Sequence, residues 1–133
     1  SKYGALYNWQ AVSSGKLCPV GWHVPSYEEW EELFNTLGGK AIAGGTLKES
    51  GTAHWDKPNM SSGYISQFAA LPGGYRNEYG DFSDIGKKGF WWSYTRNKKP
   101  AGWYQVMYNS NTSVVTRNFQ DKPVGFSVRC VKD

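Results

Sequence analysis

With 133 residues, the chain is long enough for one domain with a substantial core and too short for two. Aromatic residues make up 17% of it, with seven Trp and nine Tyr, so some of these rings are expected on an interaction surface. The net charge of +4 is uneven, with nine Lys and Arg against two Asp from Lys87 onwards. Because no nucleic-acid-binding motif is present, this charge favours solvated loop lysines, and no nucleic-acid partner is expected.

The first residues predict a strand followed by an irregular segment. Ala5 to Val12 mixes apolar and aromatic residues and is typical of a first strand, and Ser13 to Gly15 is a turn signal. The next apolar segment, Leu17 to Val24, is interrupted by Pro19 and Gly21. We expect it to be irregular or to form an edge strand.

An amphipathic helix is the clearest local prediction. Ser26 and Glu29 have the spacing of a capping box, and Gly38 with its neighbour Gly39 ends the segment. Between them the apolar residues recur at helical spacing: Trp30, Leu33, Phe34 and Leu37. Glu28 and Glu32 suit the positive end of the helix dipole, so they need no interpretation as a catalytic carboxylate pair.

The middle of the chain predicts little regular structure. A second, shorter helix is expected within Lys40 to Ser50, around Thr46 to Glu49. Gly51 to Gly89 is rich in Gly, Pro, Asn, Ser and Asp. His54 is expected to be a structural hydrogen-bonding residue, because His23 is far away in sequence. Three acidic residues are expected to form a solvated turn rather than a cation site: Glu78, Asp81 and Asp84.

The last third of the chain predicts an antiparallel sheet with polar connections. The expected strands are Phe90–Thr95, Gly102–Tyr108, Ser113–Arg117 and Gly125–Val131. The expected connections are Arg96–Ala101, Asn109–Thr112 and Asn118–Val124. The last strand is expected to pair with the first, which would bring Cys18 near Cys130. One main helix, a long irregular middle and a C-terminal antiparallel sheet make a single α+β domain over residues 1–133.

The two cysteines, Cys18 and Cys130, leave two readings open. Neither lies in a Cys-x-x-Cys pair or a cluster with zinc spacing, so no metal site or other cofactor is expected. In an exported protein they would form a disulfide that closes a loop of about a hundred residues, whereas in the cytosol they would be buried thiols. The even cysteine count and the many Asn, Ser and Thr favour export. No apolar run suits membrane insertion.

Six motifs follow one another in a specific order: Tyr3–Trp9, Leu17–Pro25, Glu28–Trp30, Leu71–Arg76, Trp91–Ser93 and Gly125–Val131. Together they closely resemble the Fibrobacter succinogenes major paralogous domain, a module common in exported proteins of Bacteroidetes. The resemblance spans nearly the whole chain. It implies a C-type lectin-like fold, in which the two chain ends meet in a sheet and long loops project from one side.

The same resemblance indicates which activities of related proteins this chain is expected to share. Calcium-dependent lectins carry Glu-Pro-Asn and Trp-Asn-Asp motifs, which are absent, so calcium-bridged sugar binding is not implied. The Trp-His-Val-Pro-Ser segment is similar to one in the formylglycine-generating enzyme branch, but the catalytic cysteine pair of that branch is missing. Variable proteins of diversity-generating retroelements also use this fold, and they diversify a C-terminal segment at adenines. The polar run here lies where that segment would lie: Tyr104, Tyr108, Asn109, Ser110, Asn111, Asn118 and Phe119.

We therefore expect a surface-displayed receptor or adhesin that binds a protein or glycan on another cell or particle, either on the cell surface or on a phage particle. The alternative is a carbohydrate binder of fixed specificity, for instance an accessory to fibre degradation. The basic half could also meet an anionic glycan or an acidic protein. No nucleophile–base pair, metal motif or phosphate loop indicates an enzyme.

The predicted binding residues interleave aromatic rings with small polar and basic groups, as paratope-like surfaces do. They are Tyr94, Arg96, Lys98, Trp103, Tyr104, Gln105, Tyr108, Asn109, Asn111, Arg117, Asn118 and Phe119. Because side chains alternate along a strand, some of this set is expected to face the core. Trp91, Trp92 and Phe126 are assigned to the scaffold.

Overall fold

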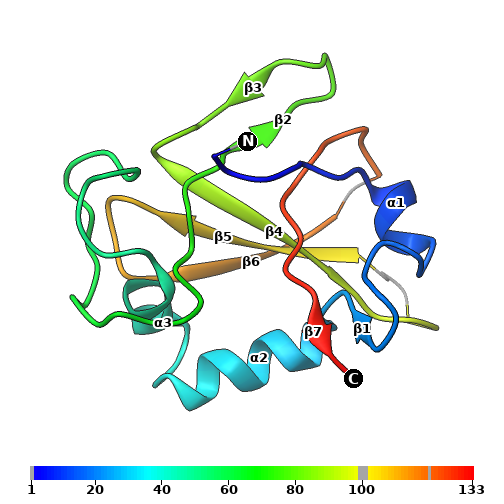
Figure 1. The fold of residues 1–133 in the computed structure, drawn as a ribbon, viewed down its shortest axis with the longest axis horizontal. Coiled ribbons are helices and arrows are strands. Elements are labelled where there is room, and N and C mark those ends of the chain that lie inside the picture. The colour runs from blue at the N-terminus through cyan, green and yellow to red at the C-terminus, as the bar shows by residue number, and fades with distance from the viewer. Residues whose placement is uncertain (1, 99–101, 120) are drawn as a thin grey trace.

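A three-stranded antiparallel sheet, in the order β4-β5-β6, lies at the centre of the computed structural model, which describes residues 2–98, 102–119 and 121–133 (Figure 1). Its strands are β4 (Lys88–Tyr94), β5 (Gly102–Tyr108) and β6 (Val114–Asn118). Two short antiparallel pairs join β1 (Trp22–His23) to β7 (Val131–Lys132) and β2 (Tyr75–Arg76) to β3 (Phe82–Ser83). The helices are α1 (Trp9–Ser13), α2 (Tyr27–Thr36) and α3 (Lys40–Leu47). The mixed α+β class is therefore confirmed.

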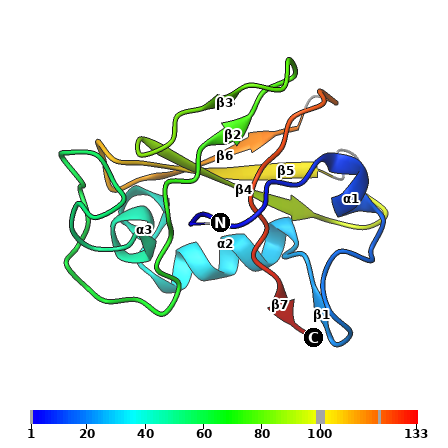
Figure 2. The same ribbon diagram turned by 45° about the horizontal axis from the view of Figure 1, so that its top comes forward.

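The two faces of the central sheet contribute to different cores. On one face Trp91, Met107 and Val114 pack with buried residues of α2 and α3, which lie below the sheet in Figure 2. On the other face Phe90, Trp92 and Val106 pack with three residues from the first and last parts of the chain: Val12, Val24 and Phe126. The scaffold assignment of the two adjacent tryptophans and of Phe126 is confirmed by their burial.

The main helix forms as its sequence predicts. Ser26 Oγ accepts a hydrogen bond from the Glu29 amide at 3.1 Å, and the Ser26 amide donates to Glu29 Oε1 at 3.3 Å. This capping box satisfies two backbone donors that the first helical turn leaves free. Trp30 and Phe34 then bury the inner face of α2 against the sheet.

The second helix lies within the expected segment, Lys40 to Ser50, but it is centred earlier than Thr46 to Glu49. The helix α3 begins directly after Gly39 and ends at Leu47, where Lys48 returns to an extended conformation. The close approach of α3 to the β5–β6 connection explains its composition, because a Cβ on Gly44 would lie 2.5 Å from the Ser113 carbonyl oxygen. The expectation of a helix at Thr46 to Glu49 overlooked this packing role of glycine.

The predicted strands at the two chain ends are also largely wrong. Asn8 caps α1 by accepting a hydrogen bond from the Ala11 amide at 3.0 Å, so a helix replaces the second half of the expected strand at Ala5 to Val12. Near the C-terminus, Gly125–Ser127 makes only single bridges, each to a different partner, and a regular strand begins only at Val131. The ends nevertheless meet as expected, since Tyr7 and Phe126 exchange two backbone hydrogen bonds of 2.8 and 3.0 Å.

A disulfide joins Cys18 to Cys130, with Cα atoms 5.9 Å apart, as predicted for an exported protein. It lies beside the β1–β7 pair, so a covalent bond and a short strand pair connect the two ends of the domain.

Within the described residues, no helix is both long and apolar enough to cross a membrane. Of the predicted connections, residues 99–101 and 120 lie outside the described part of the chain.

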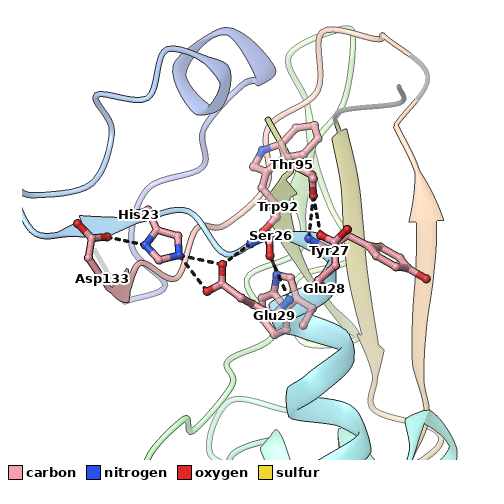
Figure 3. Close-up of polar contacts among 9 residues, drawn as sticks. His23, Ser26, Tyr27, Glu28, Glu29, Trp92, Thr95 and Asp133 are labelled. Carbon is pink, nitrogen blue, oxygen red and sulfur yellow. Dashed lines mark hydrogen bonds and ion pairs between the residues drawn. The ribbon is translucent and has the colours of Figure 1, made fainter. Parts of the chain in front are cut away.

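His23 fixes the C-terminal end of the domain to the start of α2 (Figure 3). Its Nδ1 lies 2.6 Å from Asp133 Oδ1, and its Nε2 lies 2.9 Å from both carboxylate oxygens of Glu29. Hydrogen bonding to Asp133, and then to Glu29, raises the pKa of His23 above its ordinary value. The capping glutamate of α2 therefore also serves as an anchor for β1 and β7.

Lys48 is a buried cation at the end of α3. Its side chain is fully buried, and its Nζ donates hydrogen bonds to the carbonyl oxygens of Tyr108 at 2.6 Å and Asn111 at 2.8 Å. The Trp55 ring lies 5.3 Å from the same nitrogen, and no carboxylate of the described residues pairs with it. Burial lowers the pKa of Lys48 to about 8.

Replacing Lys48 with methionine should remove a pH-dependent part of the stability. An unfolded lysine titrates near 10.5, so between about pH 8 and pH 10.5 the unfolded chain binds more protons than the folded one. The wild-type protein should therefore gain stability relative to the variant as the pH rises through this range, by up to about 3 kcal/mol. Urea unfolding of both proteins at several pH values measures the difference. A difference that stays flat or falls with pH contradicts the prediction.

Candidate ligand-binding groove

A groove of about 610 Å³ lies on the face of the central sheet that α2 and α3 leave free. The sheet supplies its floor through residues of β4, β5 and β6, including Tyr104 and Arg117, which face each other in the β5–β6 register. Its walls come from Tyr75 of β2 and from four residues that follow the sheet: Phe119, Lys122, Val124 and Phe126. The groove therefore combines side chains from three distant parts of the sequence.

The floor of the groove is aromatic. Tyr104 lies between Phe126, at 4.6 Å between ring centres, and Phe90, at 6.3 Å. Phe90 and Phe126 stack at 5.2 Å, and Tyr75 closes the group at 5.0 Å from Phe90. Burial raises the pKa of Tyr104, so its phenol is neutral near pH 7 and its hydroxyl can both donate and accept a hydrogen bond.

The charges in the groove are predominantly positive. Its lining contains Lys88, Arg117 and Lys122 but a single acid, Asp84, which Lys88 neutralises at 3.0 Å. The ammonium group of Lys88 also lies 5.7 Å from the ring centre of Tyr108. Arg117 is exposed and has no ion pair within the described residues, and Lys122 reaches only Glu78, at 3.9 Å. An anionic group entering the groove would therefore meet two available cations, the unpaired Arg117 and the weakly paired Lys122.

The glycines of the Leu71–Arg76 motif place the wall of the groove. Gly74 has a positive φ of 61°, and a Cβ there would lie 2.1 Å from the Ser83 carbonyl oxygen. Its amide donates to the Lys88 carbonyl oxygen at 2.9 Å, which joins the β2–β3 hairpin to the start of β4. Only glycine allows this close approach, which positions Tyr75 beside the sheet.

Five of the twelve residues predicted for binding lie in the groove: Tyr104, Tyr108, Arg117, Asn118 and Phe119. Sequence reasoning missed Tyr75, Lys88 and Lys122, which the fold brings in from the hairpin, the start of β4 and the last connection. The Leu71–Arg76 motif was a visible signal for the hairpin. Nothing in the sequence indicated which surface the hairpin would approach.

Two predicted residues of β5 point away from the groove. Gln105 is fully buried and its Oε1 accepts a hydrogen bond from Thr116 Oγ1 at 2.6 Å, so it is not available to a ligand. Trp103 lies on the helix side, with its ring 5.2 Å from that of Tyr27 at the start of α2. Strand alternation explains both positions, because neighbours of Tyr104 must face the opposite side.

The remaining predicted residues lie elsewhere. Tyr94 and Arg96 line a smaller hollow of about 250 Å³ beside Cys18, and Lys98 pairs with Glu28. Two asparagines serve the β5–β6 connection rather than the groove. Asn109 Nδ2 donates to the Asp56 carbonyl oxygen at 3.3 Å, and Asn111 Oδ1 accepts from the Ser113 amide at 2.9 Å.

Two of the three acids, Glu78 and Asp84, and the histidine of the middle segment, His54, have side-chain partners. Asp84 pairs with Lys88, and Glu78 lies near Lys122, so the three acids do not converge. The expected hydrogen bond of His54 is present, since its Nδ1 lies 2.8 Å from Glu49 Oε2. Within the described residues, no group of three or more His, Cys, Asp or Glu could hold a metal ion.

A second hollow, of about 580 Å³, adjoins the groove. The two share Phe119, Lys122 and Val124, so the last connection of the chain forms a wall between them. The second hollow differs in charge, because its lining contains two acids, Glu78 and Asp121, that balance its two cations, Arg76 and Lys122.

A family model described as the Fibrobacter succinogenes major domain matches residues 1–132. Searches of curated proteins and of solved structures return no significant match.

Proposed function

The chain belongs to the Fibrobacter succinogenes major domain family, and we propose that it is an exported ligand-binding module whose ligand lies in the groove on the central sheet. The groove carries the proposal, since a concave site with an aromatic floor and a few convergent polar groups is the usual form of a ligand site. The disulfide between Cys18 and Cys130 supports export, because such bonds persist in oxidising compartments.

We also infer that the fold is C-type lectin-like. The meeting of the chain ends at Tyr7 and Phe126, and again at β1 and β7, supports this inference. So does the long segment between α3 and β4, in which only the short strands β2 and β3 are regular. Within this fold the module acts as a receptor or adhesin for a protein or glycan on another cell or particle.

Part of the groove lining consists of residue types that diversification at adenines would vary, as it does in the variable proteins of retroelements. Tyr104, Tyr108 and Asn118 lie in its lining, and tyrosine and asparagine are the residue types whose codons would vary. Gln105 and Trp103 are excluded from the same surface by the strand geometry. If the chain is a variable protein, useful variation is confined to the groove side of β5 and β6.

Two residues of β5 give a matched test of the groove. Tyr108 and Trp103 are both partly exposed aromatic residues, but only Tyr108 lines the groove. The purified protein is first screened against immobilised polysaccharides and bacterial surface proteins to obtain a ligand. Tyr108→Ala should then weaken binding about tenfold or more, because aromatic anchors carry much of the binding energy at interfaces. Trp103→Ala should change binding less than about twofold.

Circular dichroism of both variants establishes that they remain folded. Equal losses in the two variants, or a loss in Trp103→Ala alone, would place the ligand on another surface and refute the groove as the site.

A further inference from the structure

We propose that the groove binds an acidic polysaccharide, with a sugar ring against Tyr104 or Tyr108 and its carboxylate on Arg117. This inference rests on the proposed ligand-binding function and names the ligand class of the same site. It follows from three properties of the lining: its charge, its aromatic floor and the limits of its positive field.

The charge of the lining favours an anionic ligand. Three cations and one acid line the groove, and the acid is already neutralised by Lys88 at 3.0 Å. Arg117 lies opposite Tyr104 in the sheet register, is exposed, and has no ion pair within the described residues. A guanidinium group presents two parallel donors that match a carboxylate, so Arg117 is suited to hold one.

The aromatic floor favours a ring over a flexible acidic chain. Tyr104 is packed against Phe126 and is therefore held in place before a ligand arrives. Tyr108 is half-buried, with the Lys88 ammonium group 5.7 Å from its ring centre. Rigid aromatic faces bind the apolar face of a sugar ring at low entropic cost, while the phenol hydroxyls can bind its hydroxyl groups.

The limits of the positive field disfavour nucleic acid, the other anionic polymer that stacks on aromatic rings. A single strand carries a phosphate about every 3.4 Å, so it requires a continuous row of cations. Beyond Phe119 the surface passes into the second hollow, where Glu78 and Asp121 offset the charges of Arg76 and Lys122, so the row of uncompensated cations does not continue. A uronic acid polymer has lower charge density. The disulfide also favours an extracellular location, where such polymers are found.

Binding to defined polymers tests the proposal by biolayer interferometry with the immobilised protein. The probes are polygalacturonate, alginate and hyaluronate, with methyl-esterified polygalacturonate as the uncharged counterpart of the first. Polyglutamate supplies charge without sugar rings, and oligodeoxythymidine supplies stacking bases with phosphate. At least one of the three uronate polymers should bind, and esterification of polygalacturonate or raised salt should weaken binding about tenfold or more.

Two variants test whether Arg117 binds the carboxylate of the ligand. Arg117→Gln should weaken uronate binding about tenfold or more, since it removes a charge-assisted hydrogen bond. Lys16→Gln is the matched control, because Lys16 is exposed, lies outside the groove and loses the same unit of charge. Its affinity should remain within about twofold of the wild type. Both sites are exposed, so thermal melting should be unchanged.

The outcomes separate this inference from the proposed function. The acidic-sugar assignment is overturned if polyglutamate or oligodeoxythymidine binds as tightly as the uronate polymers or more tightly. It is also overturned if Arg117→Gln leaves the affinity for uronate polymers unchanged. If no uronate polymer binds but a neutral glycan or a protein binds and is lost in Tyr108→Ala, the inference fails while the groove remains the ligand site. If uronates bind and both Tyr108→Ala and Arg117→Gln leave the affinity unchanged, both proposals fail.

Discussion

Replacing Cys18 and Cys130 together with serine should lower the free energy of unfolding by about 3–5 kcal/mol. The bond joins residues separated by 112 positions, so it restricts the unfolded chain over most of its length. Small domains have only about 5–15 kcal/mol of stability, so the variant should unfold at a much lower denaturant concentration. Guanidinium unfolding monitored by circular dichroism measures the loss.

The same protein under reducing conditions provides the control. It retains both sulfur atoms and loses only the bond, so its unfolding midpoint should approach that of the serine variant. A double variant within about 1 kcal/mol of the oxidised protein would contradict the predicted role of the bond. Free thiols at Cys18 and Cys130 in protein isolated from its natural compartment without reductant would remove the structural support for export.

Local sequence signals predicted the elements that depend on neighbouring residues. The capping box at Ser26 and Glu29 determined the start of α2, because both partners of that interaction lie within one helical turn. The alternation from Gly102 to Tyr108 gave β5 its observed boundaries. The cysteine pair and the ordered motifs indicated that the chain ends meet. In each case the information lies in a short segment or in residue identity alone.

Predictions failed where distant packing decides the conformation. Gly44 is a close-packing position only because distant residues surround it, so the second helix was centred too far along the chain. The first strand failed for a different reason, since the cap from Asn8 to the Ala11 amide is a local signal that its prediction overlooked. The floor of the groove needs Tyr75 and Phe126 beside Tyr104, and these residues come from three separate regions of the sequence. Such a site cannot be read from any one of them.

The sequence also could not predict which residues of β5 face the ligand groove and which face the core. β4 is buried at five consecutive positions, Gly89 to Ser93, because elements cover both of its faces. A strand that is buried on both sides has a continuous apolar sequence. The sequence therefore does not show which of its residues face which side of the sheet. The partner strand could therefore be predicted as a strand, while the choice between Trp103 and Tyr104 as groove residues required the structure.

Trp92→Ala should destabilise the protein by about 3–5 kcal/mol and also impair the groove. Trp92 is fully buried, its Nε1 donates to the Tyr7 carbonyl oxygen at 2.7 Å, and its carbonyl oxygen accepts from Trp30 Nε1 at 3.3 Å. It thus connects the first segment of the chain and α2 to the central sheet. Its ring lies 4.8 Å from Phe119 and 4.6 Å from Phe126, both of which line the groove.

Two further variants separate the contributions of Trp92. Trp92→Phe keeps most of the packing but leaves the Tyr7 carbonyl oxygen without this donor, so it should cost about 1–3 kcal/mol and largely preserve ligand affinity. Trp22→Ala removes a ring that is 45% exposed and should cost about 1 kcal/mol or less. Denaturant unfolding followed by circular dichroism ranks the three. If Trp92→Ala bound ligand as tightly as the wild type, the groove would not depend on the core beneath it, and the ligand would have to be held by the rim residues alone.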